Sequence, residues 1–251
     1  MKQLDRLYQF LEKHHQWNIA FQTREYCRYL THCETPKQRL ITLLHMVAHT
    51  QSKPKLGLLA DFWRYLEGID WEHKTPSLED LTTAIEKAGR PSTAHVGPWD
   101  RLFHSLSSVH GWGPKTSALF VKALIGLHRT ALTDLYCIRD EATSQTILGS
   151  DRIYLPVDAV IRRVFKTPEL QRLGETFGPI NRALYKAGYT PEQMLVWDDL
   201  WFWGFFTQDS STHDRVMGWN EARFWGQLSS PKTDLPELRN LCQGFLQIVN
   251  L

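Results

Sequence analysis

Residues 101–124 have the sequence RLFHSLSSVHGWGPKTSALFVKAL, in which two apolar helical patterns flank a short turn. On both sides of the turn, apolar residues recur every three or four positions, as on the buried face of a helix. Pro114 suits the first turn of the second helix, where its missing N–H has no intrahelical acceptor. Gly111 and Gly113 permit positive φ angles and a close approach of a ligand to the backbone. The segment therefore predicts two helices joined by a tight hairpin.

The beginning of the second helix suits the binding of a phosphate. The first N–H groups of a helix lack intrahelical acceptors, and the positive end of the helix dipole attracts anions. The sequence GWGPKT (111–116) matches the helix-hairpin-helix pattern, which holds a DNA phosphate without recognising base sequence. The alternative is an ordinary glycine-containing turn between two helices. The residues expected to contact DNA here are Gly111, Trp112, Gly113 and Thr116.

Helical patterns continue through most of the chain, so we expect an all-α protein. Three more helix starts carry a capping residue or a proline: Thr35, Ser77 and Thr190. Gly89 and Gly188 stand where helix C-termini are expected. The only strand-like alternation is DRIYLPV (151–157), which Pro156 shortens.

The composition is that of an ordinary globular protein. The chain has 251 residues, 42% hydrophobic and 22% charged, with a net charge of +2 that neither requires nor excludes nucleic acid. No apolar stretch has membrane-spanning length, and the charged N-terminus does not resemble a signal peptide. We expect an intracellular protein, in the cytoplasm or nucleoid, or in a nucleus. The cysteines form no CxxC pair, which leaves an iron–sulfur or zinc-ribbon site without ligands: Cys27, Cys33, Cys137 and Cys242.

A second informative segment is LPVDAVIRRVF, residues 155–165. Asp158 precedes an apolar run that suits a helix, so its carboxylate can cap that helix. The same position can instead hold a carboxylate at the rim of a cleft, facing a reacting sugar. The sequence alone leaves both roles open.

Together, GWGPKTSA and LPVDAVIRRVF resemble the helix-hairpin-helix-GPD superfamily of DNA glycosylases. The resemblance covers residues 101–165 and extends more loosely to LITLLHMVAHTQS (40–52). It implies an all-α, two-lobed fold with the active site in the cleft between the lobes. One lobe would consist of residues 1–34 and 157–251 and the other of residues 35–128, with 129–156 as an insertion.

The resemblance implies a role for several residues of this chain. Lys115 stands at the position of the nucleophilic lysine of lyase-active members, and Asp158 at that of the essential aspartate. A carboxylate would stabilise the positive charge that develops on the deoxyribose, and a lysine amine would attack C1′ to form a Schiff base. The implied DNA contacts outside the hairpin are His49 and Gln51, which would fill the gap left by an extruded base, and Arg163.

Partners, substrate and cofactors follow from the same resemblance. It implies double-stranded DNA with a damaged base, 8-oxoguanine or another oxidised purine above all, and a monomeric enzyme. No iron–sulfur cluster and no other metal is expected, apart from a monovalent cation on hairpin carbonyls near Ser107, Val109 and Trp112. Lys115 and Asp158 are farther apart in sequence than in most members, so their pairing is an assumption.

Rival interpretations remain open. The chain would be a hydrolytic glycosylase for alkylated or otherwise modified bases if Lys115 only contacts phosphate. It would be a non-catalytic DNA-binding protein if Asp158 only caps a helix. The aromatic cluster VWDDLWFWGFFTQDS (196–210) suits a helical core better than a stacking surface, and Asp198 and Asp199 within it can cap a helix or pair with Arg162 or Arg163.

Overall fold

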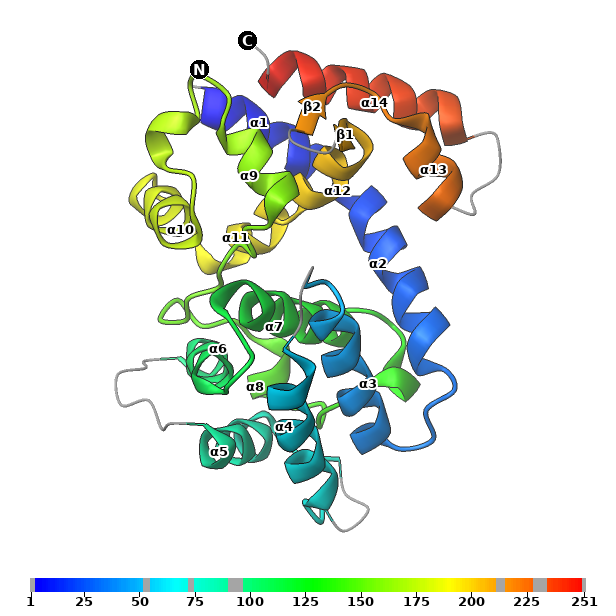
Figure 1. The fold of residues 1–251 in the computed structure, drawn as a ribbon, viewed down its shortest axis with the longest axis vertical. Helices are drawn as coiled ribbons and strands as arrows, with labels where there is room; N and C mark the ends of the chain where they lie inside the picture. Colours follow the sequence, from blue (N-terminus) through cyan, green and yellow to red (C-terminus); the bar gives the residue numbers. More distant parts are fainter. Residues whose placement is uncertain are drawn as a thin grey trace. The chain divides into compact units, whose positions relative to one another are not determined.

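The computed structural model describes residues 3–51, 55–71, 75–89, 97–210, 215–227 and 234–249. The chain is mostly helical, as the sequence predicts, and the described residues contain one sheet of two short strands (Figure 1). Among the helices described, none is both long and apolar enough to cross a membrane.

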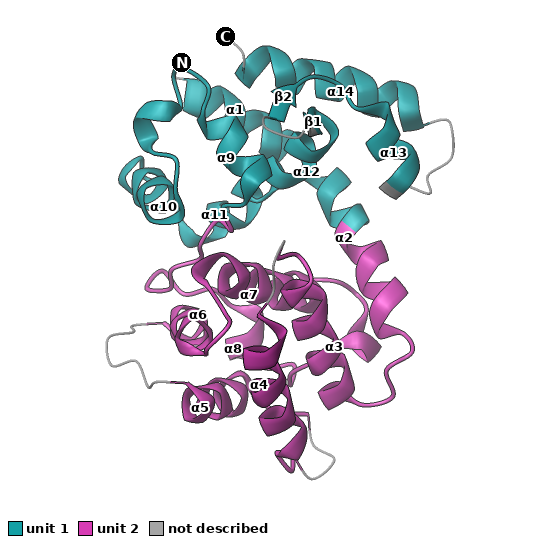
Figure 2. Ribbon diagram, in the orientation of Figure 1, with its two compact units in different colours: residues 1–21, 157–251 teal, residues 22–156 magenta. Residues whose placement is uncertain are grey.

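The chain divides into two compact units (Figure 2). Unit 1 consists of residues 1–21 and 157–251, and unit 2 of residues 22–156. This division differs from the expected one in two respects. Residues 22–34 belong to unit 2, and so does the segment 129–156, which was expected to stand apart as an insertion.

Unit 1 is built around an aromatic core. The fully buried side chains of α12 include Phe202, Trp203 and Phe206, and Trp197 at the end of α11 joins them. The predicted core role of the aromatic cluster is therefore confirmed. Helix α12 packs against α9, α13 and α14, and α1 packs against α11 and α14. The elements of unit 1 are α1 (Gln3–Lys13), the first part of α2 (His15–Leu30), α9 (Ala159–Phe165), η2 (Gln171–Leu173), α10 (Phe177–Lys186), α11 (Pro191–Trp197), α12 (Asp199–Phe206), β1 (Gln208–Ser210), β2 (Arg215–Met217), α13 (Glu221–Gln227) and α14 (Asp234–Val249).

Unit 2 is assembled on α7, whose apolar side chains are buried along most of its length. Helix α7 packs against α3, α6 and α8, and α5 packs against α6. The elements of unit 2 are the second part of α2, α3 (Pro36–Ala48), α4 (Leu56–Gly68), α5 (Leu78–Ala88), α6 (Pro98–Ser108), α7 (Pro114–His128), η1 (Thr133–Leu135) and α8 (Ala142–Gln145).

Local signals predicted the helix ends well, whereas the two short strands had no signal that was recognised in the sequence. Thr35, Ser77 and Thr190 each form a capping box, and Gly89 caps the end of α5. The strand-like alternation at 151–157 does not produce a strand, because this extended segment pairs with no other strand among the described residues. Its alternation reflects burial instead, with Ile153 and Leu155 fully buried. The strands that do form, β1 and β2, pair antiparallel with Asp209 opposite Val216.

Candidate nucleic-acid interface

In the hairpin between α6 and α7, one of the two glycines has the positive φ angle that the sequence predicts. Gly111 has a φ of +92°, which side chains rarely allow, and a Cβ there would meet Leu59 at 3.0 Å. Gly113 is extended, with a φ of −123°, and a Cβ there would meet nothing within 4 Å. Gly111 is therefore required by the fold, whereas Gly113 leaves open space beside the backbone.

The amides of the hairpin divide into those that are bonded and those that are not. The Gly113 N–H donates to Thr116 Oγ1 at 3.0 Å, and the Ser117 N–H donates to the Gly113 carbonyl at 3.0 Å. The amide of Gly111 has no acceptor among the residues that the structure describes. Together with the dipole of α7, this donor suits an anion.

Two of the predicted DNA contacts have buried side chains. Trp112 is 6% exposed and packs edge-on between Phe62 and Phe120, with ring centroids 6.2 and 6.3 Å away. Thr116 is 2% exposed, and its hydroxyl also donates to the Gly113 carbonyl. These side chains support the hairpin from within, so any contact of Trp112 or Thr116 with DNA is limited to the backbone.

Lys115 links the hairpin to the end of α3. Its Nζ donates to the Thr50 carbonyl at 3.2 Å and lies 3.4 Å from Thr50 Oγ1. His49, one residue earlier, is exposed and its Nδ1 lies 2.8 Å from the His45 carbonyl, so the ring helps to end α3. Gln51 is half-buried, and its Nε2 is buried without a partner among the described residues. Within unit 2, the structure thus brings Lys115 beside the segment 49–51.

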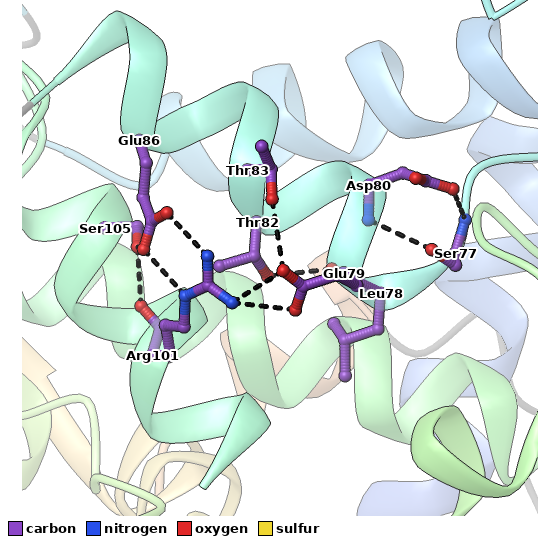
Figure 3. Close-up of polar contacts among 9 residues, drawn as sticks. All are labelled: Ser77, Leu78, Glu79, Asp80, Thr82, Thr83, Glu86, Arg101 and Ser105. Atoms are coloured by element: carbon purple, nitrogen blue, oxygen red, sulfur yellow. Dashed lines mark hydrogen bonds and ion pairs between the residues drawn. The ribbon is translucent and has the colours of Figure 1, made fainter. Parts of the chain in front are cut away.

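Helix α6 is fixed to α5 by a charged cluster (Figure 3). Arg101 donates to both oxygens of Glu79 at 2.7 Å, and to Glu86 through Nε at 2.8 Å and Nη2 at 2.7 Å. The hydrogen bonds to Glu86 and then to Glu79 raise the pKa of Arg101, which stays charged. This bidentate pairing holds the first helix of the hairpin in place.

A cap from a distant part of the chain holds the beginning of α6. Asp151 Oδ1 accepts hydrogen bonds from the amides of Trp99 at 2.9 Å and Asp100 at 3.2 Å, and its Oδ2 accepts from the Leu148 amide at 2.9 Å. Burial raises the pKa of Asp151 despite these bonds. A Cβ on Gly97 would lie 2.1 Å from Asp151 Oδ1, so only glycine fits there. Sequence analysis missed this cap because its two partners are 52 residues apart.

Asp158 caps α9, as one of its two predicted roles requires. Its Oδ1 accepts a hydrogen bond from the Ile161 amide at 2.9 Å, and the side chain is half-buried. Arg163, farther along α9, donates through Nε to the Arg215 carbonyl at 2.6 Å and so connects α9 to β2. Lys115 lies in unit 2 and Asp158 in unit 1, so their pairing stays a prediction.

Asp199, in the aromatic cluster, has different partners from the arginines considered. Asp199 is fully buried, and His15 Nδ1 lies 2.8 Å from its Oδ2, while Asn18 Nδ2 donates to its Oδ1 at 2.8 Å. Burial raises the pKa of Asp199 to about 6, against the lowering effect of His15 and Asn18. Asp198 stands at the N-cap position of α12.

Cofactor sites were predicted to be absent, apart from a cation in the hairpin. Of the carbonyls considered for that cation, Val109 accepts the Trp112 amide at 3.1 Å. The four cysteines are free thiols. Within the described ranges, no group of three or more histidine, cysteine, aspartate or glutamate side chains is placed to hold a metal ion. In comparisons with known proteins, no family model, no curated protein and no solved structure matches this chain.

Proposed function

We propose that this protein is a DNA base-excision glycosylase that holds duplex DNA by the hairpin between α6 and α7. The observation that carries the proposal is the combination of the Gly111 amide, which has no acceptor among the described residues, with the open side of Gly113 and the dipole of α7. A backbone phosphate fits this arrangement without a sequence-specific contact. Lys115, one residue into α7, adds a cation beside it.

The position of Lys115 supports its proposed role as the nucleophile that forms a Schiff base. Its amine contacts Thr50. The residues on either side of Thr50 in the sequence are His49 and Gln51, which we propose to replace an extruded base in the stack. Base extrusion costs a few kcal/mol, and such residues stabilise the gap. A lysine beside the gap would be within reach of C1′ of the extruded nucleotide and could form a Schiff base with it. The favoured substrate, an oxidised purine such as 8-oxoguanine, rests on the family resemblance alone.

In this proposal Asp158 stabilises the positive charge that develops on the deoxyribose. The cap bond to Ile161 uses Oδ1 and would keep the carboxylate in a fixed orientation. The same bond favours the rival function, a DNA-binding protein without catalysis, in which Asp158 is only a cap. Asparagine caps helices about as well as aspartate, so Asp158→Asn removes the charge and keeps the cap.

Borohydride trapping on duplexes that each carry one lesion, with an abasic site as control, tests the proposal. We expect a covalent adduct with wild type, no adduct with Lys115→Ala, and an unchanged adduct with Lys87→Ala, an exposed lysine of α5. Asp158→Asn should abolish base release while the unfolding midpoint stays within a few degrees. Base release without an adduct would make Lys115 a phosphate contact. Intact binding with neither release nor adduct would favour the non-catalytic protein.

The hairpin itself is tested by Gly113→Ala, measured by DNA affinity at several salt concentrations. A Cβ there meets no protein atom but would occupy the space that a phosphate needs. We expect at least a tenfold loss of affinity with a stability change below about 1 kcal/mol. Unchanged DNA affinity in a folded Gly113→Ala protein would contradict the placement of DNA at this hairpin.

A further inference from the structure

Three different titratable side chains meet near the beginning of α6. Asp100 and His104 belong to α6, and Tyr154 comes from the extended segment that follows the Asp151 cap. The Tyr154 phenol donates to Asp100 Oδ1 at 3.1 Å. His104 Nε2 lies 3.5 Å from that phenol oxygen and 3.5 Å from the same Oδ1. We call these residues the Asp-His-Tyr cluster.

The spacing of the cluster is one that metal sites use. Asp100 and His104 are four residues apart, so their side chains lie on one face of α6, as do the two ligands that one helix supplies in many zinc enzymes. Tyr154 adds a third donor from a different segment. Carboxylate oxygen and imidazole nitrogen both bind first-row transition metals, and a phenol that loses its proton provides an anionic oxygen.

The distances within the cluster fit one ion. Its three donor atoms are 3.1, 3.5 and 3.5 Å apart, which makes a nearly equilateral triangle. An ion placed just above the centre of such a triangle lies about 2.1 Å from each corner, the distance that zinc keeps from nitrogen and carboxylate oxygen.

The surroundings of the cluster hold two of its donors in place. The Tyr154 ring stacks on Phe103 with centroids 4.1 Å apart, and Asp100 is 7% exposed, so two of the three donors are fixed by packing. Asp151 adds a second buried carboxylate, which accepts three amide hydrogen bonds. The neighbouring cation, Arg101, is bound by Glu79 and Glu86. A cation bound by the cluster would be attracted to the carboxylates of Asp100 and Asp151.

We propose that the Asp-His-Tyr cluster is a transition-metal site, with Asp100 Oδ1, His104 Nε2 and the Tyr154 phenolate oxygen as its ligands. One nitrogen and two oxygen donors at this spacing suit a first-row divalent ion, of which zinc is the one tested below. The bound ion would connect α6 to the segment that caps it, and so would stabilise unit 2. The phenol must release its proton on binding, so affinity rises with pH. This site is independent of the proposed DNA chemistry.

The test is a titration of the chelator-treated full chain with Co²⁺, followed by visible absorption, and then with Zn²⁺ as a competitor. We expect one Co²⁺ per chain, displaced by Zn²⁺, with an affinity that increases from pH 6 to pH 8. His104→Gln and Asp100→Asn should each weaken binding at least tenfold. Tyr154→Phe, which keeps the stacking on Phe103, should weaken it and reduce its pH dependence.

A second histidine pair provides the matched control. His45 and His49 are also four residues apart, but the His45 ring stacks on Trp63 at 3.9 Å and His49 bonds to the His45 carbonyl. His45→Gln should leave Co²⁺ binding unchanged. The proposal is overturned if wild type binds no Co²⁺, if His104→Gln binds as tightly as wild type, or if His45→Gln removes binding. If Asp100→Asn does not fold, the Co²⁺ titration of His104→Gln decides the outcome, because His104 is half-exposed.

Discussion

Asp199 in unit 1 and His128 in unit 2 are both buried ionisable side chains, but only Asp199 has hydrogen-bond partners among the described residues. Asp199 is 0% exposed, and His15 and Asn18 each lie 2.8 Å from one of its oxygens. His128 in unit 2 is 4% exposed and stacks on Tyr136 at 4.0 Å. Neither nitrogen of its ring has a hydrogen-bond partner among the described residues.

Burial dominates at both sites despite this difference. It raises the pKa of Asp199 to about 6 and lowers that of His128 to about 4, so burial shifts each group toward its neutral form. Partners therefore do not decide the direction of the shift. They decide what happens when the side chain is removed, because a lost acceptor leaves its buried donors unpaired.

The largest effect is expected at a third buried group, Asp151, which has the most partners. Asp151→Ala removes the acceptor of three amides, at Trp99, Asp100 and Leu148, and should lower the free energy of unfolding by about 3–4 kcal/mol. Asp151→Asn keeps one acceptor oxygen and should lose roughly half as much. Denaturant unfolding of both variants measures this. A loss below about 1 kcal/mol for Asp151→Ala would show that water replaces the cap.

The next effect is on the pH dependence of stability, where Asp199 and His128 act with opposite signs. The lowered pKa of His128 means that the unfolded chain binds more protons between pH 6.5 and about 4, so stability falls as the pH falls through this range. The raised pKa of Asp199 means that the folded chain binds more protons between about 6 and 3.8, so stability rises as the pH falls. Each contribution amounts to about 3 kcal/mol, and in wild type they largely cancel.

Single variants should expose each half of this cancellation. His128→Phe should become more stable than wild type as the pH falls from 7 to 4, and Asp199→Asn should become less stable over the same range. Denaturant midpoints at half-unit pH steps measure both. Parallel pH curves for wild type and His128→Phe would show that His128 does not titrate in its buried site.

Sequence reasoning located helix boundaries but not these polar contacts. Thr35 and Ser77 cap helices through residues three positions away, so a local pattern was enough to predict them. The cap from Asp151 to α6, and the contact of His15 with Asp199, join segments 52 and 184 residues apart. No local pattern contains such a pair, which forms only after the helices pack.

The residues of the candidate site also divide into those whose roles a local pattern predicts and those whose roles depend on packing. Gly111 and Pro114 have the backbone roles that their types predict, because conformational preference is a local property. Trp112 was expected to contact DNA but fills a gap between Phe62 and Phe120, and nothing local distinguishes an aromatic hairpin residue that packs from one that stacks on a base. The contact between Lys115 and Thr50 likewise depends on how α3 and α7 pack.

A smaller effect is expected for His128 at neutral pH. At pH 7.5 the His128→Phe variant should be more stable than wild type by about 1–2 kcal/mol, because it removes two unpaired nitrogens and keeps a ring beside Tyr136. Asp199→Leu should have the opposite effect, since His15 and Asn18 would lose their acceptor. If both substitutions destabilise to the same extent, packing rather than hydrogen bonding controls the two sites.

The smallest effect compares two partners of one arginine. Glu86 is 14% exposed and also accepts the Ser105 hydroxyl, whereas Glu79 is 68% exposed, and both bind Arg101 at 2.7 Å (Figure 3). Glu86→Gln should cost about 1 kcal/mol and Glu79→Gln at most about 0.5, because water screens the exposed pair. Raising the salt concentration should reduce the Glu79→Gln loss more than the Glu86→Gln loss, since exposed pairs are screened more strongly. If the two variants lose the same free energy of unfolding with the same salt dependence, the distance between the charges alone sets the strength of these ion pairs. The burial of the glutamate would then have no effect on the charged contacts between α5 and α6.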